Sequence, residues 1–253
     1  MQAKVISVFS QKGGVSKTTT SVNVSTCLAL TGKKVLLIDN DPQGNCSESF
    51  DMYDNEKNIY DVMVEGVPVV DAIKETDIEN LYLLPANIIH ASTEVSLMNA
   101  MSRELVLAKA LKKVINDFDY IIIDCPPSLG LLSINSLSAS SHVIIPVRVG
   151  KYALRGLKNL FSTIEKVREH LNENISIAGV VVTQDDTNTR ISKEIRQQLQ
   201  EQLDNLVFKT VISKAVKVVE SEFESKPIVL FDKNSKVSHE YIKLTKEVEE
   251  RVR

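Results

Sequence analysis

The stretch that decides the fold is SQKGGVSKTTT, Ser10–Thr20, a glycine-rich loop between two different periodic patterns. The apolar run Val5–Phe9 before it is typical of a buried strand, and Lys17–Thr31 after it is typical of a helix. A strand, a glycine-rich loop and a helix in this order are the context of a phosphate-binding loop. The helix start would present backbone N–H groups to phosphate oxygens, with charge from Lys17 and a hydroxyl for Mg²⁺ from Thr18.

This loop departs from the usual phosphate-loop pattern at two positions. The pattern G-x-x-x-x-G-K-[ST], placed on Lys17 and Thr18, meets Gln11 and Ser16 where glycines are expected. Ser16 has two interpretations. If its position requires a positive φ or a close backbone approach, the side chain costs about 1–2 kcal/mol and predicts weak binding or slow turnover. If it does not, the backbone N–H is retained, the hydroxyl adds a donor, and the site works normally.

Short β-branched and apolar runs recur along the chain, separated by amphipathic segments of helical length. Near-continuous apolar runs that alternate with helices indicate parallel strands covered on both faces. We therefore expect a three-layer α/β fold with a mostly parallel central sheet flanked by helices. Further strands are predicted at Val35–Asp39, Leu81–Pro85, Tyr120–Asp124, Val143–Val147 and Ile177–Thr183, and further helices at Arg103–Asn116, Tyr152–Leu171, Thr189–Leu203 and Ser238–Val252.

Composition limits the functional classes. The 253 residues are 43% hydrophobic and 25% charged, and no Pro/Gly/Ser-rich linker divides them, which favours a single domain over residues 1–253. A net charge of -3 gives no bulk attraction to nucleic acid, so DNA binding would require a local basic patch. The cysteines, Cys27, Cys46 and Cys125, lack C-x-x-C spacing, and no apolar run reaches the ~18 residues of a membrane span. We expect a cytoplasmic protein.

Carboxylates follow two of the predicted strands. Asp39 and Asp41 lie in LLIDNDPQGN, and if the strand continues, period-two alternation places both on one side at the carboxyl edge of the sheet. YIIIDCPPSLG has the form of a Walker B strand, in which apolar residues lead to one acid, Asp124, that can face a metal. An alternative for Asp39 is a strand-terminal acid that caps the following turn.

The segment KGGVSKTT resembles the deviant Walker A loop, K-G-G-x-G-K-[ST]-[ST], of the ParA/MinD ATPases, and the resemblance to short Soj-like ParA proteins covers nearly the whole chain. That loop tolerates a residue other than glycine at the position of Gln11. The resemblance implies a P-loop NTPase fold with ATP and Mg²⁺ as cofactors. The residues expected to bind the nucleotide are Gln11, Lys12, Gly13, Gly14, Val15, Ser16, Lys17, Thr18 and Thr19.

The same resemblance implies roles for individual residues. Lys12 matches the signature lysine that reaches across an ATP-sandwich dimer to the partner's phosphates, so Lys12, Lys17 and Asp41 are expected to be catalytic, with Asp41 helping to place the attacking water. D-x-D-P-Q-G-N and D-x-P-P-S are two switch segments of the family, and both are present. The residues expected at the metal are Thr18, Asp39 through water, and Asp124 indirectly.

The chain also departs from the family pattern. Ser16, Gly150 and Arg155 stand where the family usually has glycine and two glutamates, and Ala215 replaces an asparagine on the adenine side. Asn188, Lys214 and Lys217 replace arginines, although the two lysines keep the charge that nonspecific DNA binding uses. The expected DNA-binding residues are Arg190, Lys193, Arg196, Lys214 and Lys217; the alternative is a solvated charged face.

The resemblance implies a ParA-type ATPase that partitions a plasmid, chromosome or mobile element. ATP would close a homodimer that binds DNA nonspecifically on the nucleoid, and hydrolysis stimulated by a ParB-like centromere-binding partner would release it. One alternative is a non-hydrolysing, nucleotide-dependent DNA-binding regulator in which Ser16 has disabled turnover. Another is a MinD-like membrane-positioning ATPase, but the terminal SHEYIKLTKEVEERVR is dense in both signs of charge, so no stable membrane association is expected.

Overall fold

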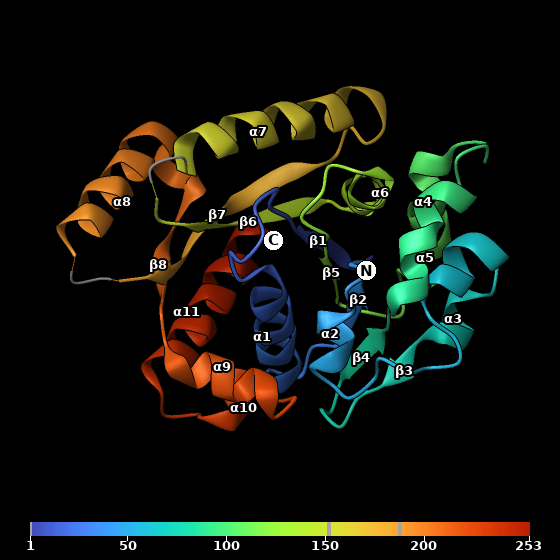
Figure 1. Cartoon of the computed structure of the whole chain (residues 1–253), viewed down its shortest axis with the longest axis horizontal. Helices are drawn as coiled ribbons and strands as arrows, with labels where there is room; N and C mark the ends of the chain where they lie inside the picture. Colours follow the sequence, from blue (N-terminus) through green and yellow to red (C-terminus); the bar gives the residue numbers. More distant parts are fainter. Residues whose placement is uncertain (1, 151–152, 187–188) are drawn as a thin grey trace.

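A central sheet organises the computed structural model, which describes residues 2–150, 153–186 and 189–253 (Figure 1). The sheet is 8-stranded, in the order β3-β4-β2-β5-β1-β6-β7-β8. Neighbouring strands pair in parallel, except that β3 is antiparallel to β4. The strands are β1 (Lys4–Val8), β2 (Val35–Asp39), β3 (Lys74–Glu75), β4 (Leu81–Leu84), β5 (Tyr120–Asp124), β6 (His142–Arg148), β7 (Ser176–Asp185) and β8 (Val207–Ser213).

Helices cover both faces of this sheet, with α1, α10 and α11 on one face and α5, α6 and α7 on the other (Figure 1). This arrangement confirms the expected three-layer α/β fold. The α-helices are α1 (Lys17–Leu30), α2 (Asn45–Glu48), α3 (Val69–Ala72), α4 (Thr93–Ser96), α5 (Val106–Leu111), α6 (Leu131–Ala139), α7 (Ala153–His170), α8 (Arg190–Leu203), α9 (Val216–Phe223), α10 (Ile228–Phe231) and α11 (Lys236–Arg251).

The central strands are apolar throughout because each serves two cores. In β5, Ile121 and Ile123 belong to the core under α5–α7, whereas Ile122 belongs to the core under α1 and α11. Successive side chains of a strand point to opposite faces, so a strand covered on both sides needs apolar residues at every position. All three isoleucines are fully buried.

Some predicted elements differ from the structure. The helix expected over Arg103–Asn116 is instead a 3₁₀ turn, η3 (Arg103–Leu105), followed by the short α5 and further turns. The edge strand β8 was not predicted, because it carries the polar Lys209 and Thr210 between apolar residues and so lacks the continuous apolar run of the central strands. Tyr152, the expected start of one helix, lies outside the described residues.

The last helix, α11, packs its apolar face inside the protein. It begins after Ser235, whose hydroxyl accepts a hydrogen bond from Ser238 N at 3.2 Å and caps the first turn. Tyr241, Leu244 and Val248 are at most 1% exposed and belong to the core shared with α1. Within the described residues, no helix is both long enough and apolar enough to cross a membrane.

Candidate nucleotide-binding site

Strand order brings the predicted site residues to one edge of the sheet. β5 lies between β1 and β2, and its last residue, Asp124, is in register with Val8 on one side and with Asp39 on the other. The glycine-rich loop leaves β1 at this same edge. In parallel α/β sheets, ligands bind where the carboxyl ends of strands meet.

The loop enters helix α1 through a left-handed residue. Gly14 has φ 67°, and Ser16 has φ 59° and ψ 37°. The condition of the first interpretation of Ser16 is therefore met: its position has a positive φ, which costs a residue with a side chain about 1–2 kcal/mol. The Ser16 side chain makes no capping hydrogen bond to α1, so the N–H groups of the first turn remain oriented towards a ligand.

Two consecutive residues at the end of β7 hold this loop. Thr183 Oγ1 donates a hydrogen bond of 3.0 Å to Val15 O, and Gln184 Nε2 donates one of 2.9 Å to Ser16 Oγ. Thr183 is fully buried and Val15 is 1% exposed. The loop conformation is thus fixed by contacts from a strand that lies far along the sequence.

A hydroxyl and a carboxylate meet where a metal is expected. Thr18 Oγ1 donates to Asp124 Oδ2 at 2.7 Å, and Ser21 Oγ donates to Asp124 Oδ1 at 2.8 Å. Burial raises the pKa of Asp124 to about 6, although both hydroxyls and the charge of Lys17 oppose this shift. Hard oxygen donors of this kind suit Mg²⁺ carried by a nucleotide phosphate. Among the described side chains, no group of three or more His, Cys, Asp or Glu is placed to hold a metal ion.

Asp39 and Asp41 occupy different environments. β2 ends at Asp39, so the condition for placing both acids on one side of a continuing strand is not met. Asp39 is fully buried; its Oδ2 accepts from Ser47 N at 2.8 Å and Ser47 Oγ at 2.7 Å, and its Oδ1 accepts from Asp41 N at 3.1 Å. Burial and the nearby Asp124 raise the pKa of Asp39 to about 8. Asp39 therefore makes the hydrogen bonds that its capping alternative predicts, and its expected role at the metal stays a prediction. Asp41 lines the cavity described next.

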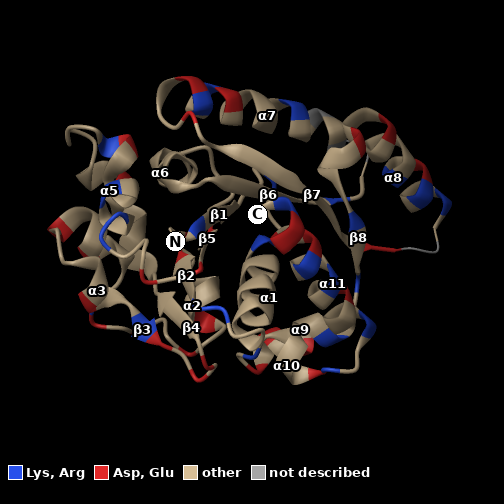
Figure 2. Ribbon diagram, turned by 180° about the vertical axis from the view of Figure 1, so that it is seen from behind, with Lys and Arg blue, Asp and Glu red and all other residues tan. Residues whose placement is uncertain are grey.

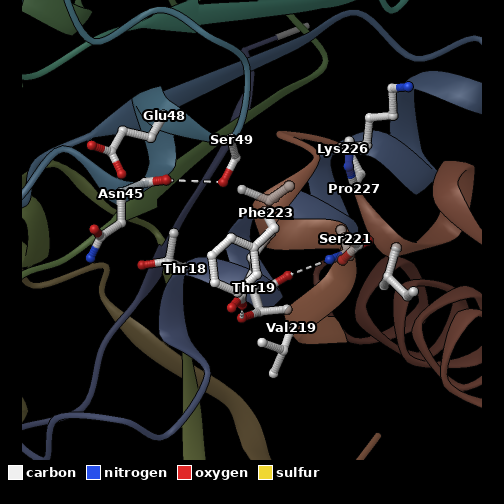
Figure 3. Close-up of a pocket in the computed structure, with 14 residues that line it drawn as sticks. Thr18, Thr19, Asn45, Glu48, Ser49, Val219, Ser221, Phe223, Lys226 and Pro227 are labelled. Atoms are coloured by element: carbon white, nitrogen blue, oxygen red, sulfur yellow. Dashed lines mark hydrogen bonds between the residues drawn. The ribbon is translucent and has the colours of Figure 1, made fainter. Parts of the chain in front are cut away.

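A cavity of about 600 Å³ lies in front of these residues and is called the nucleotide cavity here. Phosphate-loop residues line one side, and the junction of β8 and α9 lines the other. An adjoining cavity of about 570 Å³ shares Thr18, Thr19, Asn45, Val219 and Glu222 with it. Figure 3 shows Thr19 beside Val219 and Phe223 of α9. Lining residues of the nucleotide cavity include Gly13, Gly14, Lys17, Asp41, Gln184 and Ala215.

The structure does not bring every predicted loop residue to this cavity. Gln11, Lys12 and Val15 line a separate cavity of about 290 Å³ with Arg148 and Leu157. Lys12 is exposed, whereas Lys17 is 8% exposed at the base of the loop. The two lysines of the deviant motif thus point into different surroundings.

Comparison with known proteins gives the family. A family model described as an AAA domain matches residues 3–177. The chain is 45% identical, over 247 residues, to the sporulation initiation inhibitor protein Soj of Bacillus subtilis, covering 97% of this chain and 98% of that protein. The chain belongs to the ParA/MinD family of P-loop ATPases.

Further relatives of this ParA-type ATPase support the same family assignment. It is 37% identical over 254 residues to the chromosome partitioning protein ParA of Caulobacter vibrioides, covering 99% of this chain and 95% of that protein. Among solved structures, the cobyrinic acid a,c-diamide synthase of Mycobacterium smegmatis, with bound ATP analogue and magnesium, has a TM-score of 0.85 and 32% identity. The match covers 96% of this chain and 93% of that one.

A buried polar network that the sequence did not reveal ties Asn40, directly after β2, to α6. Asn40 Nδ2 donates to Leu132 O at 2.9 Å and to Ser136 Oγ at 2.7 Å, which leaves Asn40 Oδ1 to accept from His90 Nε2 at 2.9 Å. His90 Nδ1 then accepts from Thr93 Oγ1 at 2.9 Å. Burial lowers the pKa of His90 to about 3, so the imidazole is neutral.

The five cations expected to bind DNA, which we call the basic surface, lie on α8 and at the β8–α9 junction. Three pair with acids: Arg190 with Glu194 at 2.7 Å, Arg196 with Asp185 at 2.9 Å and Lys217 with Glu220 at 2.7 Å. Figure 2 shows basic and acidic residues interspersed along α8.

Only part of the basic surface converges on one place. Lys214 and Lys217 line a cavity of about 530 Å³ with Lys236, which sequence reasoning missed. Lys193 and Arg190 are exposed on α8 outside this cavity. Asn188 lies outside the described residues.

Several residues of the site were not predicted from the sequence, although the position of one, Ser21, could have been recognised from helical spacing. Ser21 follows Thr18 by three positions on a predicted helix, so helical spacing places both on one face. Gln184 and His90 contact residues far away along the chain, and no local pattern marks either one.

Proposed function

We propose that residues 1–253 form a single ATPase domain that uses ATP and Mg²⁺. The observation that carries this proposal is the hydrogen bond between Thr18 and Asp124 beneath the first turn of α1. It places a hydroxyl, a carboxylate and helix N–H groups beside one cavity, as phosphate and metal require. Thr18 would hold Mg²⁺, which would neutralise phosphate charge, while Asp124 would act on the metal indirectly and Asp39 through water. The phosphates would lie along Gly13–Thr19, with Lys17 against them.

Hydrolysis in this proposal depends on positioning. Asp41 is 8% exposed at the cavity, and its Oδ1 accepts from Gln43 N at 3.0 Å. This bond fixes the carboxylate and leaves Oδ2 to orient the attacking water. Phosphoryl transfer relies mainly on such positioning and on charge stabilisation. Ser16 adopts a left-handed conformation, which is strained for a residue with a side chain and is held only by the surrounding contacts. We therefore expect turnover to be slow.

The cycle that we propose is nucleotide-dependent dimerisation and DNA binding. Lys12, which is exposed outside the nucleotide cavity, would reach the phosphates held by a second copy. The closed dimer would bind DNA nonspecifically through the basic surface, on the nucleoid in the cytoplasm. Hydrolysis stimulated by a ParB-like centromere-binding protein would release it. The relatives named for chromosome partitioning support this use in segregating a chromosome, plasmid or mobile element.

DNA retention with ATP and Mg²⁺ tests the cycle. The wild type should retain plasmid DNA with ATP but not with ADP, and Lys12→Ala should lose the ATP-dependent part. Lys166→Ala is a matched control, because Lys166 is exposed on α7, away from the nucleotide cavity. Equal retention by wild type and Lys12→Ala would contradict the dimer-dependent step.

One specific observation favours a second candidate. The strained Ser16 is compatible with a non-hydrolysing, nucleotide-dependent DNA-binding regulator. In that case ATP turnover stays negligible in the wild type, with DNA and the ParB-like partner present, and Asp41→Ala changes nothing. MinD-like membrane positioning is disfavoured, because the apolar face of α11 packs inside the protein and is not available to bind lipid. Co-sedimentation with liposomes and ATP would separate that function.

A further inference from the structure

The residue opposite the strained position of the phosphate loop is itself strained. Gln184 has φ 49°, and Ser16 has φ 59°, although neither is glycine. The left-handed region disfavours residues with a side chain, and such residues persist where surrounding contacts determine them. The contact that joins them is the 2.9 Å hydrogen bond from Gln184 Nε2 to Ser16 Oγ.

An irregularity in the sheet aims Gln184 at the loop. Val182 is in register with Val211, and Asp185 is in register with Ser213. Between these two pairs β7 therefore has one residue more than β8, which is a β-bulge. A bulge of this kind changes the direction of a side chain. Within the same segment, Thr183 Oγ1 donates to Val15 O of the loop at 3.0 Å.

We propose that Gln184 is a positioning residue of the ATP site, which keeps Ser16 in its left-handed conformation and so makes a loop without the expected glycine able to bind phosphate. This inference rests on the proposed ATP binding. Glycine needs no such restraint, because it adopts positive φ without a Cβ penalty. The Gln184 amide therefore matters only as long as residue 16 carries a side chain.

The dependence of one residue on the other can be measured with a double-mutant cycle. The variants are Gln184→Met, Ser16→Gly and the two combined; methionine keeps the length of glutamine but cannot donate. Affinity for the non-hydrolysed analogue AMPPNP with Mg²⁺ is measured by calorimetry. Gln197→Met is the matched control, because Gln197 is exposed on α8 and donates at 2.8 Å to Glu201 only one turn away.

Gln184→Met should weaken AMPPNP binding about fivefold in the protein that keeps Ser16, the size expected for one hydrogen bond. In the Ser16→Gly background the same change should alter binding by less than about twofold, and Gln197→Met should have no effect. Equal weakening in both backgrounds would overturn the proposal, because Gln184 would then contact the nucleotide directly. No weakening in either background would overturn it as well.

Thermal unfolding of the nucleotide-free proteins separates this inference from the proposed function. Gln184→Met should lower Tm by about 2 °C when Ser16 is present and leave it unchanged in the Ser16→Gly background. If the wild type binds no AMPPNP, ATP binding fails as the proposed function, and this Tm cycle alone decides whether Gln184 restrains Ser16. Equal Tm losses in the two backgrounds would show that it does not.

Discussion

Thr18 at the nucleotide cavity, and Asp39 and Asp124 behind it, are fixed by hydrogen bonds that are buried or partly buried. Four of the five cations of the basic surface are exposed, and Arg196 is half-buried against Asp185. The cavity partners come from different strands and helices. On the basic surface, by contrast, Arg190 and Lys217 pair with acids of their own helices. Phosphate and metal chemistry requires exact placement, but nonspecific DNA binding requires mainly charge. Changes in the first region should therefore act through geometry, and changes in the second through ionic strength.

The largest effect should come from the cavity. Lys17→Ala removes the charge at the base of the phosphate loop, so AMPPNP affinity should fall by about tenfold to a hundredfold, the loss expected when charge-assisted hydrogen bonds to phosphate are removed. Calorimetric titration with Mg²⁺ measures it, and Lys166→Ala is the control. An affinity within a few-fold of wild type would contradict the claim that exact placement of Lys17 against the phosphates determines binding in the nucleotide cavity.

A smaller, salt-dependent effect is expected on the basic surface. Lys193→Ala combined with Lys217→Ala should reduce DNA retention uniformly across sequences, because lysines that bind DNA phosphates release counterions. The slope of log affinity against log salt should fall by about 0.9 for each lysine–phosphate pair that the substitutions remove. Titration of salt against wild type and the Lys166→Ala control gives this slope. An unchanged slope would show that DNA binds elsewhere.

The buried network of Asn40, His90 and Ser136 predicts a pH effect. His90 has a folded pKa of about 3 against 6.5 unfolded, so the unfolded chain gains a proton as pH falls below 6.5 and the folded chain does not. Stability from this group is present above pH 6.5 and is lost towards pH 3. The free energy of unfolding should drop by about 1 kcal/mol more between pH 7 and 5.5 in wild type than in His90→Gln.

Denaturant unfolding across this pH range measures the effect. His170→Gln is the control, since His170 is exposed at the end of α7. If His90→Gln shows the same pH slope as wild type, His90 is not held neutral by burial. The other members of this network, Asn40, Thr93 and Ser136, do not ionise in this pH range, so His90 is its titrating member.

The smallest effect should come from a surface ion pair. Arg190→Ala removes the 2.7 Å contact with Glu194, four residues along α8. Pairs of this kind contribute up to about 0.5 kcal/mol, so the free energy of unfolding should hardly change. Denaturant unfolding at low and high salt measures it. A decrease in the free energy of unfolding above about 1 kcal/mol would mean that this ion pair stabilises the fold as a buried pair does, which would contradict the comparison.

Sequence patterns predicted the parts of the molecule that local chemistry determines. β2 and β5 have the predicted bounds, because fully buried strands require continuous apolar runs. The weakly periodic β8 was not predicted, and the single helix expected over Arg103–Asn116 was wrong, because tertiary contacts decide both segments. The left-handed φ of Ser16 and its contact with Gln184, 168 positions away, depend on the bulge in β7, which no local pattern marks.

Phosphate release from ATP tests the central claim most directly. It should be measured for wild type and Asp41→Ala with Mg²⁺, plasmid DNA and the ParB-like partner, with Lys166→Ala as control. The wild type should release phosphate slowly but measurably, and Asp41→Ala should be slower by at least about a hundredfold while still binding AMPPNP. Equal rates for wild type and Asp41→Ala, or no release from either, would contradict a hydrolytic switch built on this cavity.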